Sequence, residues 1–141
     1  MKILKIGTDK RRVGDIGERA AARYLRRHGY RIIERNYVAC GNEVDIIAAN
    51  RQYIIFVEVK TRNIDKDNPK EPRPASAVTP EKQRKIMHVA SYYKAYPPVD
   101  KKMRMDIIEV YLEGNSGKEK IKSINHMIGA FDRSSYIVYR I

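Results

Sequence analysis

Cysteine and long apolar runs are scarce in this 141-residue chain, and each scarcity excludes a class of protein. A single cysteine, Cys40, excludes an intramolecular disulfide and a cysteine-based zinc site. The longest apolar run covers only residues 53–57, whereas about 20 apolar residues are needed to span a bilayer. The chain has neither a P-loop nor a GxGxxG motif, so nucleotide-cofactor chemistry has no basis in the sequence. We therefore expect a soluble, cytoplasmic protein.

Basic residues are in excess, because 29 Lys and Arg face 17 Asp and Glu and give a formal net charge of +12. Such an excess favours a polyanionic partner, most simply nucleic acid. The excess lies in residues 1–35 and 63–105, whereas residues 36–62 and 106–141 contain equal numbers of acidic and basic residues. The most informative carboxylates lie in the balanced segment 36–62.

The hydrophobic pattern predicts an α/β fold with a mixed sheet, in a single domain that covers residues 1–141. An amphipathic helix is expected at residues 13–28, ended by Gly29, and a second at residues 80–96, begun by Thr79 and Pro80. Residues 63–78 contain three prolines and mixed charges, which predicts a mobile loop without a packed element. The β-prone stretches predict strands at residues 30–36, 43–49, 53–61, 105–112, 120–125 and 136–141.

The second and third strands are expected to form a hairpin with a tight two-residue turn at positions 50–51. That register places Asp45 opposite Phe56. Asp45 and Glu58 then lie diagonally on one face of the sheet, about 7–8 Å apart. Lys60 shares this face, because side chains alternate along a strand.

Two carboxylates and a lysine on one sheet face are energetically costly. The two negative charges repel each other, and polar side chains take positions where apolar side chains could be buried. A divalent cation would remove this repulsion, and Mg²⁺ is usually held by one or two carboxylates with several waters. An ion at Asp45 and Glu58 would polarise a phosphodiester and activate an attacking water. Lys60 would stabilise the charge that develops on the phosphate. Glu18, at the edge of the apolar stripe of the first helix, would add a further carboxylate.

A purely structural interpretation stays open for each of these residues. Asp45, Glu58 and Lys60 can form a cross-strand salt bridge on a solvated face. The Glu18 side chain can extend to solvent or form a salt bridge with a basic side chain. The arginines of the first helix can serve solubility instead of contacting phosphates.

The spacing of Asp45 and Glu58-Val59-Lys60 resembles the D-x(n)-(D/E)-x-K signature of restriction-endonuclease-like nucleases. Glu18 lies on a helix before the first strand, and this position is similar to that of a helix-borne glutamate in Holliday-junction resolvases and RecB-type nuclease domains. The chain as a whole is similar to the YraN-like family of bacterial proteins from about residue 12 to residue 132. The matching stretches are residues 14–18, 36–48, 56–62, 79–83, 106–108 and 126–131.

The resemblance implies a restriction-endonuclease-like core sheet flanked by helices. It implies Mg²⁺ (or Mn²⁺) bound by Asp45 and Glu58, with the Val59 carbonyl or Glu18 as further ligands. It also implies that Lys60 serves the attacking water, so the expected catalytic set is Glu18, Asp45, Glu58 and Lys60. The residues expected to bind the phosphates of the substrate are Lys82 and Gln83 on the second helix and Arg19 and Arg23 on the first.

The sequence is therefore compatible with two functions. The first is a metal-dependent endonuclease that hydrolyses phosphodiester bonds in DNA, including branched or damaged DNA, either alone or as a homodimer. The second is a non-catalytic nucleic-acid-binding protein that retains the nuclease fold. The complete set of Glu18, Asp45, Glu58 and Lys60 favours the first, because a protein that only binds has no need for it.

Overall fold

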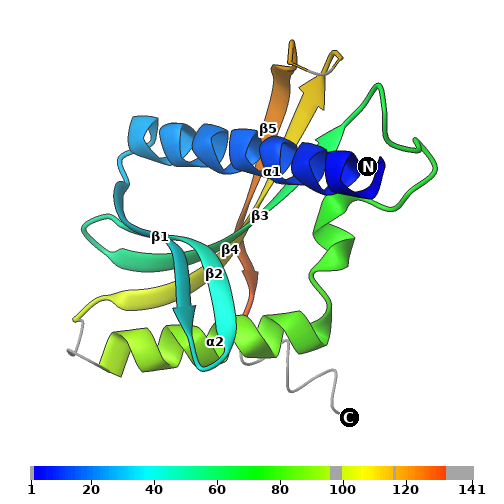
Figure 1. The fold of residues 1–141 in the computed structure, drawn as a ribbon. Helices are drawn as coiled ribbons and strands as arrows, with labels where there is room; N and C mark the ends of the chain where they lie inside the picture. The colour runs from blue at the N-terminus through cyan, green and yellow to red at the C-terminus, as the bar shows by residue number, and fades with distance from the viewer. Residues whose placement is uncertain (1, 96–99, 116, 133–141) are drawn as a thin grey trace.

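A computed structural model describes residues 2–95, 100–115 and 117–132 of the chain. Five strands form one mixed sheet in the order β1-β2-β3-β4-β5, and two helices lie on opposite faces of it (Figure 1). The helices are α1 (Lys2–Arg27) and α2 (Pro80–Ala95), and the strands are β1 (Arg31–Ala39), β2 (Asn42–Ala49), β3 (Tyr53–Asn63), β4 (Lys102–Glu113) and β5 (Lys120–Phe131). The predicted α/β class is confirmed, and the arrangement is consistent with a restriction-endonuclease-like fold. No helix in the described ranges is long and apolar enough to cross a membrane.

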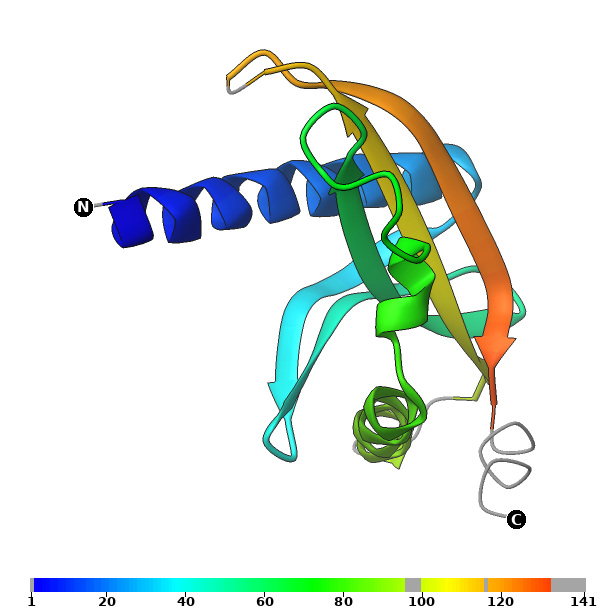
Figure 2. The same ribbon diagram turned by 90° about the vertical axis from the view of Figure 1, so that its right-hand side faces the viewer.

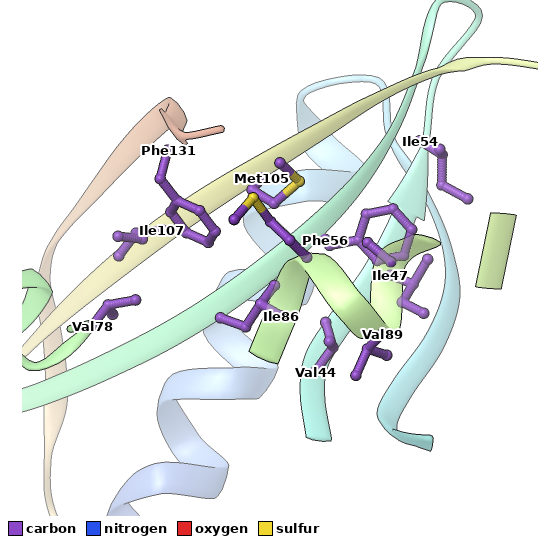
Figure 3. Close-up of a cluster of buried hydrophobic side chains, with 12 residues drawn as sticks. Val44, Ile47, Ile54, Phe56, Val78, Ile86, Val89, Met105, Ile107 and Phe131 are labelled. Atoms are coloured by element: carbon purple, nitrogen blue, oxygen red, sulfur yellow. The ribbon is translucent and has the colours of Figure 1, made fainter. Parts of the chain in front are cut away.

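The strand at the centre of the sheet is β3, which pairs antiparallel with β2 and parallel with β4. This position explains the apolar run at the start of β3, because a central strand is buried on both faces. Ile55 and Val57 face α1, while Ile54 and Phe56 face α2. Figure 3 shows Phe56 within the cluster on the α2 side, together with Ile86 of α2.

Helix α1 begins at Lys2, eleven residues before the predicted start at position 13. The prediction was wrong because it followed only the amphipathic part of the helix, although residues 2–12 contain no proline to stop it. The predicted end, position 28, lies one residue beyond Arg27, the last residue of the helix, and Gly29 follows with φ +87°, as expected of a residue that ends a helix. Arg23 and Arg26 are exposed, and Leu25 is buried against the sheet, as the pattern indicated.

Beside the apolar packing on β4, two polar contacts join α1 to the described part of the C-terminal half. Figure 2 shows the helix lying across the upper part of β4 and β5. The Arg12 guanidinium forms a two-pronged ion pair with Glu119. The Tyr24 hydroxyl lies 3.1 Å from His126 Nδ1, and His126 Nε2 lies 2.7 Å from Asp106 Oδ2. Both contacts join residues more than 100 positions apart in the sequence.

The segment 63–78 contains a short 3₁₀ helix, η1 (Pro74–Ala77), so the expectation that it holds no packed element was wrong. The reason is the Glu109 carboxylate on β4, which is fully buried and accepts hydrogen bonds from Arg73 Nη2 at 2.6 Å and Ala75 N at 3.0 Å. A polar segment is thus held by a buried acceptor that its own sequence does not reveal.

Three other expectations concern the C-terminal part of the chain and the end of the second helix. The last β5 residue is Phe131, six residues beyond the predicted end of that strand. The strand predicted at residues 136–141 and the predicted last residue of the second helix, position 96, lie outside the described residues.

Candidate functional site

The two-residue turn between β2 and β3 lies at positions 51–52 instead of the predicted 50–51, which moves the register. Asn50 N donates to Tyr53 O, so these two residues flank the turn, and the Asn50 side-chain oxygen accepts hydrogen bonds from Gln52 N and Tyr53 N. The observed pairs run from Ala49↔Ile54 to Ile46↔Val57. Continued by one residue, this register places position 45 opposite position 58. The predicted register was therefore wrong by two residues, and its correction places Asp45 opposite Glu58.

Asp45 lies just beyond Ile46↔Val57, the last backbone pair between β2 and β3, where a side-chain hydrogen bond joins the two strands. Its Oδ2 accepts a hydrogen bond from Val59 N at 2.7 Å. The carboxylate thus takes the place of a backbone acceptor, and the sheet itself fixes its position.

Glu58 is almost fully buried, with 5% of its surface exposed. Its Oε1 lies 3.6 Å from the Lys60 Nζ and 4.0 Å from the Lys82 Nζ. Its Oε2 is buried and has no hydrogen-bond partner among the described residues. A buried acceptor without a partner is costly, so this oxygen is available to a ligand that can enter the site.

The carboxylates of this region have raised pKa values. Burial raises the pKa of Glu58 to about 7, the charge of Asp45 adds to this, and Lys82 and Lys60 oppose it. Burial also raises the pKa of Asp45, although the hydrogen bond from Val59 N opposes the shift. Burial and the charge of Asp45 raise the pKa of Glu18 to about 7. Each of these anions therefore lacks sufficient positive charge around it.

Glu18 joins Asp45 and Lys60 in lining one cavity of about 500 Å³ at the end of β3. It reaches this position because Gly17 lets the backbone of α1 approach β3 closely. A Cβ atom at position 17 would overlap Thr61 Oγ1 and lie 3.0 Å from Thr61 Cβ. The glycine is therefore part of how Glu18 is placed.

Whether these residues fit a divalent cation depends on how many ligands converge and on which cation they would hold. Across residues 2–95, 100–115 and 117–132, no three Asp, Glu, His or Cys side chains converge closely enough to enclose a metal ion. Mg²⁺, however, is usually held by only one or two carboxylates, with water completing its shell. Asp45 and Glu58 supply two carboxylates, and Glu58 Oε2 is an unused acceptor. The donor set fits a hard cation bound by these two residues.

The four residues predicted to bind phosphates lie in different surroundings. Lys82, in the first turn of α2, reaches Glu58. The Gln83 amide donates to Val78 O and so helps to hold the start of α2. Arg19 and Arg23 lie on the exposed side of α1, where Arg19 pairs with Asp15.

Asn36 of β1 is a residue at this site to which the sequence assigned no role. With the amide oriented so that its nitrogen faces the carboxylates, Nδ2 donates to Glu18 Oε1 at 2.8 Å and to Glu43 Oε1 at 3.1 Å. Its two partners lie on two other elements, α1 and β2, so no local pattern in the sequence predicts these contacts.

Comparison with known proteins places these residues within one family. The model of the Uncharacterised protein family UPF0102 matches residues 17–110, which include the four predicted catalytic residues. A UPF0102 protein of Caldanaerobacter subterraneus is 40% identical over 129 residues, covering 87% of this chain and 97% of the relative. A UPF0102 protein of Clostridioides difficile is 42% identical over 119 residues, covering 84% of this chain and 95% of the relative.

Proposed function

The chain belongs to the UPF0102 family, and we propose that it is a metal-dependent endonuclease that hydrolyses phosphodiester bonds in DNA. The observation that carries this proposal is the buried Glu58 carboxylate, whose Oε2 has no hydrogen-bond partner among the described residues and whose Oε1 faces Lys60 and Lys82. Asp45 is close enough for its charge to raise the pKa of Glu58. Paired carboxylates next to lysines suit the binding of a cation and a phosphate together.

Asp45 and Glu58 would hold Mg²⁺ or Mn²⁺, which supplies a more acidic water and a polarised phosphodiester when bound. Asp45 is suited to this role because Val59 N fixes one of its oxygens. Glu18 lines the same cavity and would hold the cation or orient a water from the α1 side.

The two lysines near Glu58 would have different roles. Lys60 lies at the cavity and next to Glu58, where its ammonium group would orient the attacking water or stabilise the charge that develops on the phosphate. Lys82 reaches the same carboxylate from α2 and would bind the phosphate from the other side. The exposed arginines of α1 add positive charge that favours a polyanion.

The test is cleavage of linear duplex, single-stranded and four-way-junction DNA with Mg²⁺, Mn²⁺ or EDTA. Glu58→Gln keeps the shape of the side chain and removes its charge, so it should abolish cutting and weaken Mn²⁺ binding by about tenfold or more in calorimetry. Glu81→Gln is the matched control, because Glu81 is an exposed carboxylate on α2 that pairs with Lys85. Cutting that persists in EDTA or in Glu58→Gln would refute the assigned site.

The second candidate function is nucleic-acid binding without catalysis. It is favoured by the lack of three converging metal ligands among the described residues and by the two lysines that already face Glu58 Oε1. Salt-sensitive binding of DNA with no cutting by the wild-type protein under any of these conditions would support it over the endonuclease.

A further inference from the structure

Asn36 has a backbone conformation that its place in a strand does not require. Its φ is 53°, in the left-handed region, which residues other than glycine adopt rarely and asparagine tolerates better than most. The β1–β2 pairs Arg35↔Ile46 and Tyr37↔Val44 keep the same register on its two sides. The register of this pairing shifts only farther along β1, between Ile32 and Glu34, so a strained residue between two pairs of unchanged register suggests that its side chain has a role.

The side chain of Asn36 joins carboxylates from two other elements. Its amide nitrogen donates to Glu18 on α1 and to Glu43 on β2. Glu18 is the one predicted catalytic residue that lies on a helix instead of the sheet. Without a tie to the sheet, a glutamate side chain has several rotamers available and loses considerable entropy when it is ordered.

We propose that Asn36 is a positioning residue, which orients the Glu18 carboxylate toward Asp45 in the reaction assigned above; this inference rests on the proposed function. The amide engages one oxygen of Glu18 and leaves the other for the cavity that both carboxylates line. Asparagine suits this position because it supplies a donor without a charge. A lysine or arginine would compete with a bound cation, and an aspartate would repel Glu18.

The variant Asn36→Gly tests the proposal, because glycine adopts the positive φ without strain and removes the side chain that carries the amide. The matched control is Cys40→Gly. Cys40 is the other residue besides glycine with a positive φ (54°) in the described part of the chain, and it is exposed at the turn that follows β1. Mn²⁺ affinity is measured by calorimetry on the full chain without nucleic acid, and cleavage is measured at saturating Mn²⁺.

We expect Asn36→Gly to lower the Mn²⁺ affinity and the cleavage rate by about tenfold, which is typical when a group that orients a metal ligand is lost. The unfolding temperature should stay within the range of Cys40→Gly, whose affinity and rate equal those of the wild type. In a Glu18→Ala background, Asn36→Gly should have no further effect, because the amide acts through Glu18.

Two results would overturn the proposal alone. One is wild-type affinity and rate in Asn36→Gly. The other is a full additional loss in the Glu18→Ala background, which would show that Asn36 acts independently of Glu18. A wild-type protein that neither binds Mn²⁺ nor cuts DNA would instead refute the proposed function, and this inference with it.

Discussion

Two glycines of α1, three residues apart, should respond in opposite directions to the same substitution. A Cβ atom at Gly14 has no heavy atom within 4 Å. Gly14→Ala therefore gains only the helix propensity of alanine and should stabilise the protein by about 0.5–1 kcal/mol. At Gly17 the same methyl group would overlap Thr61 Oγ1. Gly17→Ala must therefore separate α1 from β3 locally or move Thr61.

The cost at Gly17 follows from what can move. Rotation of the Thr61 side chain shifts Oγ1, but it leaves Thr61 Cβ 3.0 Å from the new methyl group, closer than ordinary van der Waals contact. The backbone must therefore shift, and overpacking of this kind costs about 1–3 kcal/mol. This cost exceeds the gain of about 1 kcal/mol in helix propensity, so we expect a net loss of up to about 2 kcal/mol. Because Gly17 adjoins Glu18, cleavage should fall as well.

Urea denaturation followed by circular dichroism compares Gly14→Ala, Gly17→Ala and the double variant Gly17→Ala/Thr61→Ala. Removal of the Thr61 hydroxyl and methyl should return part of the lost stability, so the two substitutions should not be additive. If Gly14→Ala and Gly17→Ala stabilise the protein equally, α1 does not touch β3 at Gly17, and the packing described here is refuted.

Three further predictions concern the site and its surroundings. Lys60→Ala should abolish cleavage and leave DNA binding nearly intact in a gel-shift assay; an equal loss of both would make Lys60 structural. Although burial opposes it, hydrogen bonds from His126 and Arg104 hold the pKa of Asp106 below its usual value. Stability from Asp106 is therefore present above about pH 4 and lost as the pH falls below it. Asp106→Asn should cost about 3 kcal/mol at neutral pH and flatten this acid dependence in urea titrations from pH 3 to 7, and an unchanged profile would contradict the assignment. Arg23→Ala should reduce the slope of log K for DNA against log salt by about 1 if Arg23 contacts a phosphate, whereas an unchanged slope would leave it a solvated surface residue.

The sequence predicted the fold class well because the main elements satisfy local rules. Strand β3 combines the strongest β propensity with a polar end, and α2 begins at Thr79 and Pro80, where the Thr79 hydroxyl accepts a hydrogen bond from Lys82 N. The exposed arginines of α1 also follow directly from helical periodicity. These features depend on neighbours within a few positions.

The errors had two kinds of cause. The 3₁₀ helix at residues 74–77 depends on a distant residue, Glu109, which lies over 30 positions away. The hairpin register depends on a local choice, whether the turn lies at positions 50–51 or 51–52, and the sequence around Asn50 does not decide between them. A shift by two residues keeps the face of every side chain, so Asp45 and Glu58 stayed on one face although the predicted register was wrong.

The candidate site could be predicted in part. Asp45, Glu58 and Lys60 lie on paired strands, so period-two alternation was enough to bring them together. Glu18 and Asn36 could not be joined in this way, because their contact depends on how α1 crosses the sheet. That crossing depends on the close contact between Gly17 and Thr61, which only the three-dimensional structure shows.

The ties between α1 and the C-terminal half also set an order of events during synthesis. Helix α1 is made first, but Arg12 and Tyr24 meet Glu119 and His126 only after nearly the whole chain has been made. The sheet face that α1 covers is built from β2, β3 and β4, with Ile46, Ile55 and Ile108 among its buried residues. A ribosome-bound chain that ends before β4 therefore already contains part of this face, together with Asp45 and Thr61, which lie close to Glu18 and Gly17. It lacks the two polar ties to Glu119 and His126, so α1 would be placed on the sheet first and secured there only when the C-terminal half has been made.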